Sequence, residues 1–156
     1  FRSIGGRAGL VRLDTLAPEH PMVAAELMTK DPATVKSSTT VDEAAQKMRE
    51  LNIRHLPIIH AGQIVGVISD RDLTALLYED LMNLGSGDGG ARLNQAVGDV
   101  MSGDVLTAGP ETEATELIEL FIEHKIGAIP IVDTDGGSLL GIVSYVDILR
   151  AAADLF

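Results

Sequence analysis

Two short motifs in this chain place a serine three residues before an aspartate: Ser69 with Asp72, and Ser144 with Asp147. Each motif stands where an apolar run ends and a helical pattern begins. A serine at a helix start can accept a backbone N–H, and an acid three residues later complements the helix dipole. The same carboxylate can accept hydrogen bonds from both vicinal hydroxyls of a sugar. Helix capping and ligand binding are therefore two interpretations of one motif.

A basic pair, Arg54 and His55, directly precedes a predicted strand, and Arg71 lies inside the first motif. Arg can bind two phosphate oxygens at once, and His can add a further donor. The alternative is a solvated basic pair at the start of a strand. The matching place later in the chain holds Gly127 and Ala128, so a site built on these residues is asymmetric.

The composition excludes several classes of function. The 156 residues carry a net charge of −11, which opposes binding to nucleic acid because phosphate neutralisation needs a basic face. There is no cysteine, and the four histidines lack metal-ligand spacing, so we expect no metal and no thiol chemistry. No apolar run approaches the ~20 residues that span a bilayer. We expect a cytoplasmic protein that requires no cofactor and has no catalytic residues.

The chain repeats itself. A register offset of 73 residues runs from Met28 to His60 without a gap, and an offset of 75 continues from Ile64 to Thr74. Of these 44 paired positions 12 are identical, and the apolar pattern agrees further. Two copies of one structural unit are the expected result.

Each copy has the pattern of a β-α-β-β-α unit. In the first copy, Thr40 and Glu43 have the spacing of a capping box, which predicts a helix start at Thr40. The expected strands are 33–35, 56–59 and 64–68, followed by a helix from about 70 to 81. In the second copy they are 105–107, 129–132 and 139–143, followed by a helix from about 145 to the end of the chain. Apolar residues at helical spacing predict helix faces at 41–51 and 114–122.

We therefore predict an α+β fold of two β-α-β-β-α repeats packed sheet to sheet about a pseudo-twofold axis, because one small sheet exposes an apolar face that a second copy can cover. The expected divisions are an extension over 1–21, the first repeat over 22–82, a Gly-rich linker over 83–96 and the second repeat over 97–156. The chain does not begin with Met, which suggests a processed or excised fragment.

Three segments of the first copy resemble the cystathionine-β-synthase-type (CBS) domain: Met28–Val35, Ile53–Ile59 and Gly62–Leu73. The second copy resembles it through Ile126–Val132 and Gly141–Asp147. The resemblance covers roughly residues 22–154 as a tandem pair, often called a Bateman module. It implies a regulatory module that binds AMP, ADP, ATP or S-adenosylmethionine in clefts between the repeats and that forms a homodimer. The regulated protein or attached domain is not identified by the sequence.

The resemblance also assigns roles to individual residues. It implies that Asp72 and Asp147, with Ser69 and Ser144, hold the ribose. Phosphate contacts fall to the basic positions before Pro57, namely Arg54 and His55, with Arg71 as a further candidate. The adenine would lie against Pro32, Ala33 and Thr34 in one cleft and against Leu106 and Thr107 in the other.

In this arrangement each cleft combines the Ser-x-x-Asp motif of one repeat with the first strand of the other. Asp147 would then share a cleft with Pro32, Arg54 and His55, and in the Asp72 cleft Gly127 and Ala128 would supply no charge. We predict that a phosphorylated ligand prefers the Asp147 cleft. The alternatives are a structural dimerisation module without a ligand, or a sensor of S-adenosylmethionine. The apolar faces of the two final helices predict the homodimer.

Overall fold

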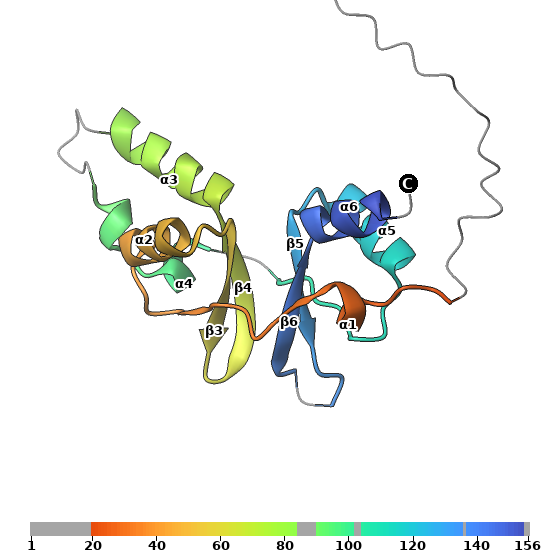
Figure 1. Ribbon diagram of the computed structural model, residues 1–156. Helices are drawn as coiled ribbons and strands as arrows, with labels where there is room; N and C mark the ends of the chain where they lie inside the picture. The colour runs from red at the N-terminus through yellow and green to blue at the C-terminus, as the bar shows by residue number, and fades with distance from the viewer. Residues whose placement is uncertain (1–19, 84–89, 102–103, 136, 155–156) are drawn as a thin grey trace, which may run out of the picture.

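The computed structural model describes residues 20–83, 90–101, 104–135 and 137–154. The expectations for the extension over 1–19 and for the glycine-rich part of the linker, 84–89, lie outside these ranges. The described chain forms two small sheets with helices against them (Figure 1). The predicted α+β class is confirmed.

The first repeat contains the five predicted elements. They are β2 (Val35–Lys36), α2 (Val41–Leu51), β3 (His55–His60), β4 (Gln63–Ser69) and α3 (Asp70–Met82). Thr40 caps α2 as predicted: its hydroxyl accepts the Glu43 N–H, and its own N–H donates to the Glu43 carboxylate. Ala61 and Gly62 join β3 to β4 with φ values of 48° and 80°, the left-handed pair that a tight hairpin turn requires.

The second repeat differs from its prediction at the first strand. It contains α5 (Ala114–His124), β5 (Ala128–Val132), β6 (Leu139–Ser144) and α6 (Tyr145–Ala153). Residues 105–107 do not form a strand; a single bridge joins Ala108 to Ile131. Gly109 and Pro110 follow at once, and a proline cannot donate to a ladder. The predicted helix face is also only half correct, because Leu117 and Phe121 are buried whereas Ile118 and Ile122 are exposed.

The first strand of the chain crosses between the repeats. β1 (Thr29–Lys30) belongs to the first copy by sequence, yet it pairs antiparallel with β6 of the second. The two sheets therefore have the orders β2-β3-β4 and β1-β6-β5. Gly141 permits this pairing, because a Cβ at that position would lie 2.8 Å from the carbonyl oxygen of Thr29.

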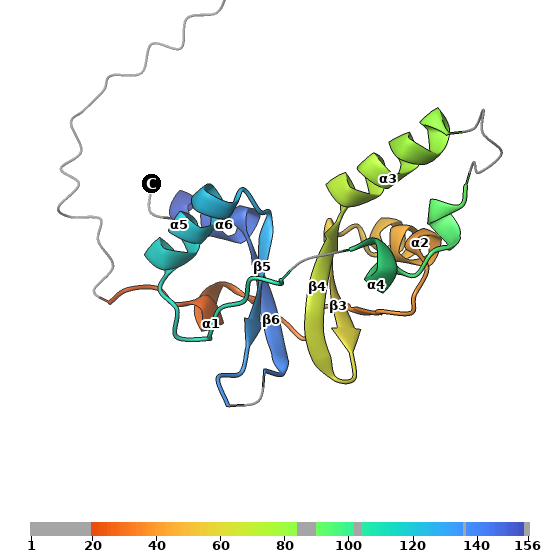
Figure 2. The same ribbon diagram turned by 180° about the vertical axis from the view of Figure 1, so that it is seen from behind.

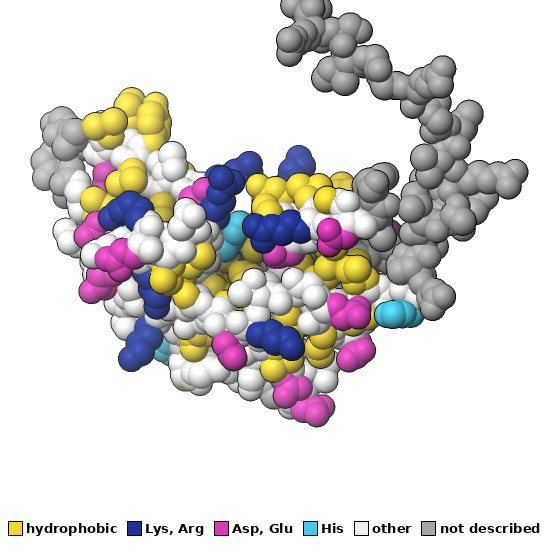
Figure 3. All heavy atoms as spheres, viewed as in Figure 1, with side chains coloured by type: hydrophobic (Ala, Val, Ile, Leu, Met, Phe, Trp, Pro, Cys, Tyr) yellow, Lys and Arg dark blue, Asp and Glu magenta, His cyan; other side chains and the backbone are white. Residues whose placement is uncertain are grey.

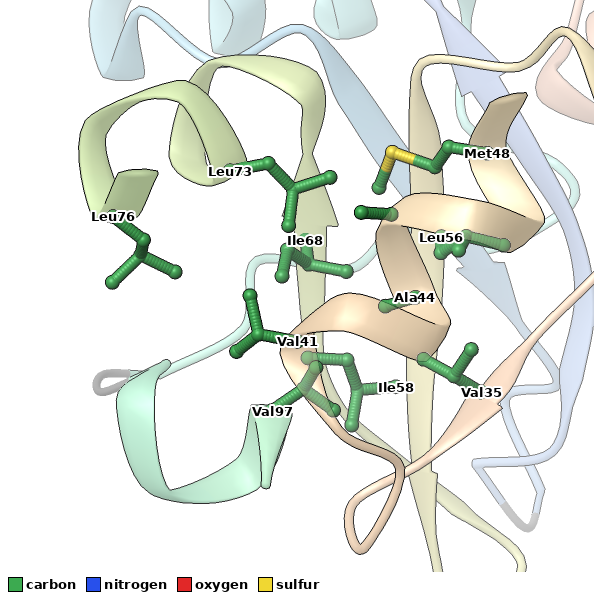
Figure 4. Close-up of a cluster of buried hydrophobic side chains, with 11 residues drawn as sticks. Val35, Val41, Ala44, Met48, Leu56, Ile58, Ile68, Leu73, Leu76 and Val97 are labelled. Atoms are coloured by element: carbon green, nitrogen blue, oxygen red, sulfur yellow. The ribbon is translucent and has the colours of Figure 1, made fainter. Parts of the chain in front are cut away.

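Two short helices are exchanged between the repeats in the same way. α1 (Ala24–Leu27) packs in the core of the second repeat, and α4 (Val97–Val100) packs in the core of the first (Figure 4). Ala24 and Val97 are related by the repeat offset of 73 residues, and both are fully buried. Their backbone N–H groups donate to equivalent carbonyls, those of Thr112 and Thr39. The core of each repeat thus includes the short helix that precedes the other repeat in the sequence.

The arrangement in space follows from these exchanges. The two hairpins lie next to each other in the middle of the molecule, with α2 and α3 on one side and α5 and α6 on the other (Figures 1 and 2). α3 and α6 both begin at the same end of the hairpins. The starts of these two helices therefore flank the line between the repeats.

The last part of the predicted linker is held against α3. Residues Arg92–Asn94 form a short 3-10 helix, η3. The Arg92 N–H donates to the buried Asp80 carboxylate at 3.3 Å, and the Arg92 side chain pairs with Glu79 at 3.2 Å. Among the described residues, no helix is long and apolar enough to cross a membrane.

Candidate functional site

A cavity of about 590 Å³ opens between the two repeats at the starts of α3 and α6. The first repeat contributes the beginning of β3, the end of β4 and residues 69–72. The second repeat contributes the last turn of α5, Lys125 after it, the beginning of β5 and Tyr145. Five residues that the sequence singled out line this cavity: Arg54, His55, Ser69, Arg71 and Asp72.

Asp72 has one oxygen bound to its own repeat and one that is not. Its Oδ2 accepts hydrogen bonds from the Ser69 N–H and the Ser69 hydroxyl, both at 2.7 Å. The Ser69 hydroxyl in turn accepts the Asp72 N–H at 3.2 Å. Within the described chain, no group donates to Oδ1. The capping interpretation is therefore correct for one oxygen and leaves the other able to accept bonds from a ligand.

The equivalent carboxylate in the second repeat is engaged on both oxygens. Asp147 Oδ2 accepts from the Ser144 N–H at 2.8 Å and from its hydroxyl at 2.7 Å. Asp147 Oδ1 lies 3.6 Å from Arg150 Nη1. Ala75 stands in place of Arg150 in the first repeat, so Asp72 has no such competitor.

His55 reaches across the line between the repeats. Its Nε2 is 2.6 Å from the position that a Cβ on Gly127 would take, so only glycine leaves room for the ring. Burial lowers the pKa of His55 below its usual value; the nearby Asp70 and Asp72 oppose that shift, and Arg54 and Arg71 add to it. Burial of the ring therefore favours its neutral form.

Three cations line the cavity from both sides: Arg54 and Arg71 from the first repeat, and Lys125 from the second. Among the described residues, none of them makes an ion pair. With Asp70 and Asp72 as the two carboxylates of the cavity, one net positive charge remains in a chain that is acidic overall. Figure 3 shows Lys and Arg side chains gathered over the hollow between the two halves, with a histidine between them.

The remaining predicted residues lie elsewhere. Pro32, Ala33, Leu106 and Thr107 are half-buried in irregular chain, and Pro57 is fully buried in β3. The Thr34 carbonyl is occupied by Lys47 Nζ at 2.7 Å. Ser144 and Asp147 are not among the residues that line the cavity.

The structure brings the basic residues together with a different aspartate from the one that the sequence predicts. Arg54 and His55 line a cavity with Asp72, not with Asp147 and Pro32. The reason is local: the β3–β4 hairpin pairs His55 with Ser69, which brings the basic residues to the start of α3. The cavity also includes residues that the sequence analysis did not single out, among them Asp70, Phe121, Lys125 and Tyr145.

A second cavity, of about 520 Å³, lies at the opposite end of the first hairpin. Its lining includes Ser37, His60 and Asp99. The Ser37 hydroxyl and His60 Nδ1 are hydrogen-bonded to each other at 2.7 Å. The described residues contain no group of three or more His, Cys, Asp or Glu that could hold a metal ion.

Two homologous α+β repeats with a polar cavity between them define a class of tandem-repeat binding modules. The chain matches the CBS domain family twice, over residues 23–79 and 97–154, and it belongs to that family. The resemblance noted in the sequence is thereby confirmed.

The relatives include both free-standing modules and parts of larger enzymes. The chain is 30% identical to CBS domain-containing protein YhcV of Bacillus subtilis over 123 residues, which cover 79% of this chain and 80% of that protein. It is 34% identical to an inosine-5'-monophosphate dehydrogenase of Methanocaldococcus jannaschii over 128 residues. That match covers 81% of this chain but spans only 23% of the dehydrogenase.

Several solved structures share the fold, among them two that contain a bound ligand. One is CBSX2 in complex with AMP, with 34% identity, a TM-score of 0.70, and coverage of 85% of this chain and 97% of that one. The other is the CBS domain pair of protein MJ0100 in complex with 5'-methylthioadenosine and S-adenosyl-L-methionine, with 25% identity and a TM-score of 0.70. It covers 86% of this chain and 98% of that one.

Proposed function

We propose that this chain is a regulatory module that binds an adenine nucleotide (AMP, ADP or ATP) in the cavity beside Asp72. The observation that carries the proposal is that Asp72, whose Oδ1 accepts no hydrogen bond from the described residues, lines a cavity with three cations that make no ion pair within the described part of the chain. A carboxylate oxygen without a protein donor can accept the hydroxyls of a ribose, and the cations can bind phosphate. The AMP complex of the relative CBSX2 supports this assignment.

The charge of the cavity favours a nucleotide over S-adenosylmethionine. Arg54, Arg71 and Lys125 outnumber Asp70 and Asp72, so the cavity repels a sulfonium and attracts a phosphate. Apolar side chains of the second repeat, Phe121 and Ile126, offer a surface for the base.

Regulation is the output we propose, because the chain consists largely of the two repeats. In the dehydrogenase relative, the matching part spans only 23% of the protein. We propose that nucleotide binding here controls an attached domain or a separate protein in the cytoplasm, with no catalysis by this module.

The test is calorimetric titration of AMP, ADP, ATP, adenosine and S-adenosylmethionine into the wild type, Asp72→Asn and Asp147→Asn. Asn keeps an oxygen for the Ser69 cap but weakens the ribose contact, and a charge-assisted bond is worth about 1.5–3 kcal/mol. We expect Asp72→Asn to lower AMP affinity by roughly 10-fold or more, and Asp147→Asn to leave it nearly unchanged. No binding by the wild type would favour a structural dimerisation module without a ligand. A larger loss of AMP affinity in Asp147→Asn than in Asp72→Asn would mean that the nucleotide site lies at Asp147.

We also propose a homodimer that forms through α3 and α6. Leu77, Leu81 and Met82 of α3 are 45%, 62% and 66% exposed, and Leu149 of α6 is 61% exposed. Large apolar side chains this exposed on both final helices favour a partner surface. Leu81→Glu should give a monomer by light scattering, whereas Leu51→Glu, on a 50% exposed leucine of α2, should not. A wild type that stays monomeric at all concentrations would overturn the dimer.

A further inference from the structure

Lys125 occupies a backbone conformation that does not favour lysine. It ends α5 with φ 53° and ψ 36°, in the left-handed region. Its counterpart in the first repeat, Asn52, ends α2 with φ 51° and ψ 47°. Asn tolerates this conformation better than other non-glycine residues, and it is a common residue after a helix. The backbone therefore explains Asn52 but not the choice of lysine at position 125.

The position of Lys125 supplies a reason. Its side chain lines the cavity from the second repeat, and Arg54 and Arg71 line it from the first. It has no ion pair among the described residues, and neither do the two arginines. Of the carboxylates in the cavity, Asp72 binds Ser69 through one oxygen, and Asp70 accepts the Arg71 N–H at 2.9 Å. Arg54, Arg71 and Lys125 are thus able to bind an anion that contacts both repeats.

We propose that Lys125 is a specificity-determining residue of the Asp72 cavity: it binds the phosphate of the ligand from the second repeat and so selects phosphorylated ligands over neutral nucleosides. This inference rests on the proposed nucleotide site. A phosphate held between Lys125 and the two arginines links the repeats through the ligand. Phosphate binding is then what distinguishes the occupied module from the empty one.

The competing explanation is that Lys125 complements the negative end of the α5 dipole. A residue with only that role would affect the stability of the empty protein and would treat all ligands alike. A phosphate contact, in contrast, changes the ratio between the affinity for AMP and the affinity for adenosine. The experiment must therefore measure both ligands.

The test compares the wild type, Lys125→Asn and Lys36→Asn by calorimetric titration with adenosine, AMP and ADP. Lys125→Asn installs the residue of the first repeat, which suits the left-handed backbone, so the variant should unfold at the wild-type temperature or above. Lys36→Asn removes the same charge from the exposed residue of strand β2, which is not among the residues that line the cavity, and it controls for overall electrostatics. Lys125→Gly, which also suits a positive φ, serves if the Asn variant folds poorly.

We expect Lys125→Asn to weaken AMP and ADP by roughly tenfold, the lower end for one charge-assisted bond, and to leave adenosine within about twofold. Lys36→Asn should match the wild type for all three ligands. Equal loss of adenosine and AMP, or no loss of either, would overturn the role of Lys125 while leaving the nucleotide site in place. A wild type that binds none of the three would overturn both proposals.

Discussion

The imidazole of His55 lies against Gly127 of the other repeat, with Nε2 2.6 Å from the position of a Cβ on that glycine. The offset of 73 residues makes Gly127 the counterpart of Arg54, the neighbour of His55. The two repeats are therefore unequal for a steric reason: the ring of one occupies the space that a side chain of the other would need. This contact makes the cavity asymmetric and places the His55 ring at the boundary of the repeats.

Gly127→Ala should disturb the cavity more than the fold. The obstructing atom is the far end of a side chain that can rotate, so we expect the free energy of unfolding to fall by less than about 1 kcal/mol, below the usual cost of overpacking. The displaced ring should enter the cavity and weaken AMP binding several-fold. Chemical denaturation and calorimetry measure the two effects.

The double variant His55→Ala/Gly127→Ala is the control for this prediction. With the ring absent, the added methyl group meets no obstacle, so Gly127→Ala should cause no further loss in the His55→Ala background. Additive losses would show that the alanine acts through something other than the ring.

His55 should also make stability depend on pH. Burial lowers its pKa in the folded protein below the value near 6.5 of the unfolded chain, so the unfolded chain binds the proton first as the pH falls. The contribution of the neutral His55 ring to the free energy of unfolding is complete above pH 6.5. It is lost as the pH falls through the pKa that His55 has in the folded protein. The thermal unfolding temperature of the wild type should therefore fall more steeply below pH 6.5 than that of His55→Gln. The other three histidines are common to both proteins, and parallel pH profiles would contradict the prediction.

The elements that the sequence predicted well are those with local signals. Thr40, Ser69 and Ser144 each cap a helix through a residue three positions later, and the turn at Ala61 and Gly62 defines a hairpin. These patterns act within a few residues, so they can be read without the fold. The short helices at 24–27 and 97–100 have no such signal, because four-residue helices form only where tertiary packing holds them.

The sequence singled out five residues that line the cavity, but it grouped Arg54 and His55 with Asp147 rather than with Asp72. The turn at Ala61 and Gly62 predicts a regular register in which His55 pairs with Ile68. A bulge between Ile58 and Ile59 shifts the register by one residue and pairs His55 with Ser69, and the turn alone does not reveal that shift. The contributions of Lys125 and Tyr145 were not accessible, because they depend on how the second repeat is placed against the first.

The exchange of short helices predicts that a mutation near the second repeat destabilises the first. Val97 is fully buried in the core of the first repeat, so Val97→Ala should cost about 2 kcal/mol from two lost methyl groups and the cavity they leave. Hydrogen exchange should rise in α2 and β3. Val65→Ala, at a 42% exposed valine, is the control and should cost well under half as much. Hydrogen exchange that rises only in the second repeat would contradict the packing of α4 in the core of the first repeat.

The crossing of β1 predicts a large difference between two glycines at equivalent positions. Gly66 and Gly141 are related by the offset of 75 residues, and neither has a positive φ. A Cβ at Gly66 would meet only the end of the Ile58 side chain, at an ordinary 3.5 Å. A Cβ at Gly141 would lie 2.8 Å from the Thr29 carbonyl oxygen, which cannot move without breaking the β1–β6 pairing.

Gly141→Ala should therefore lower the free energy of unfolding by about 2–3 kcal/mol, the upper range for forced overpacking, and should release β1. Gly66→Ala should be close to neutral, because ordinary contact costs little and alanine reduces the freedom of the unfolded chain. Denaturant unfolding gives the two energies, and hydrogen exchange at Asp31, whose N–H donates to the Leu140 carbonyl at 3.3 Å, reports on β1. Equal effects of the two substitutions would mean that β1 does not lie against Gly141 in solution.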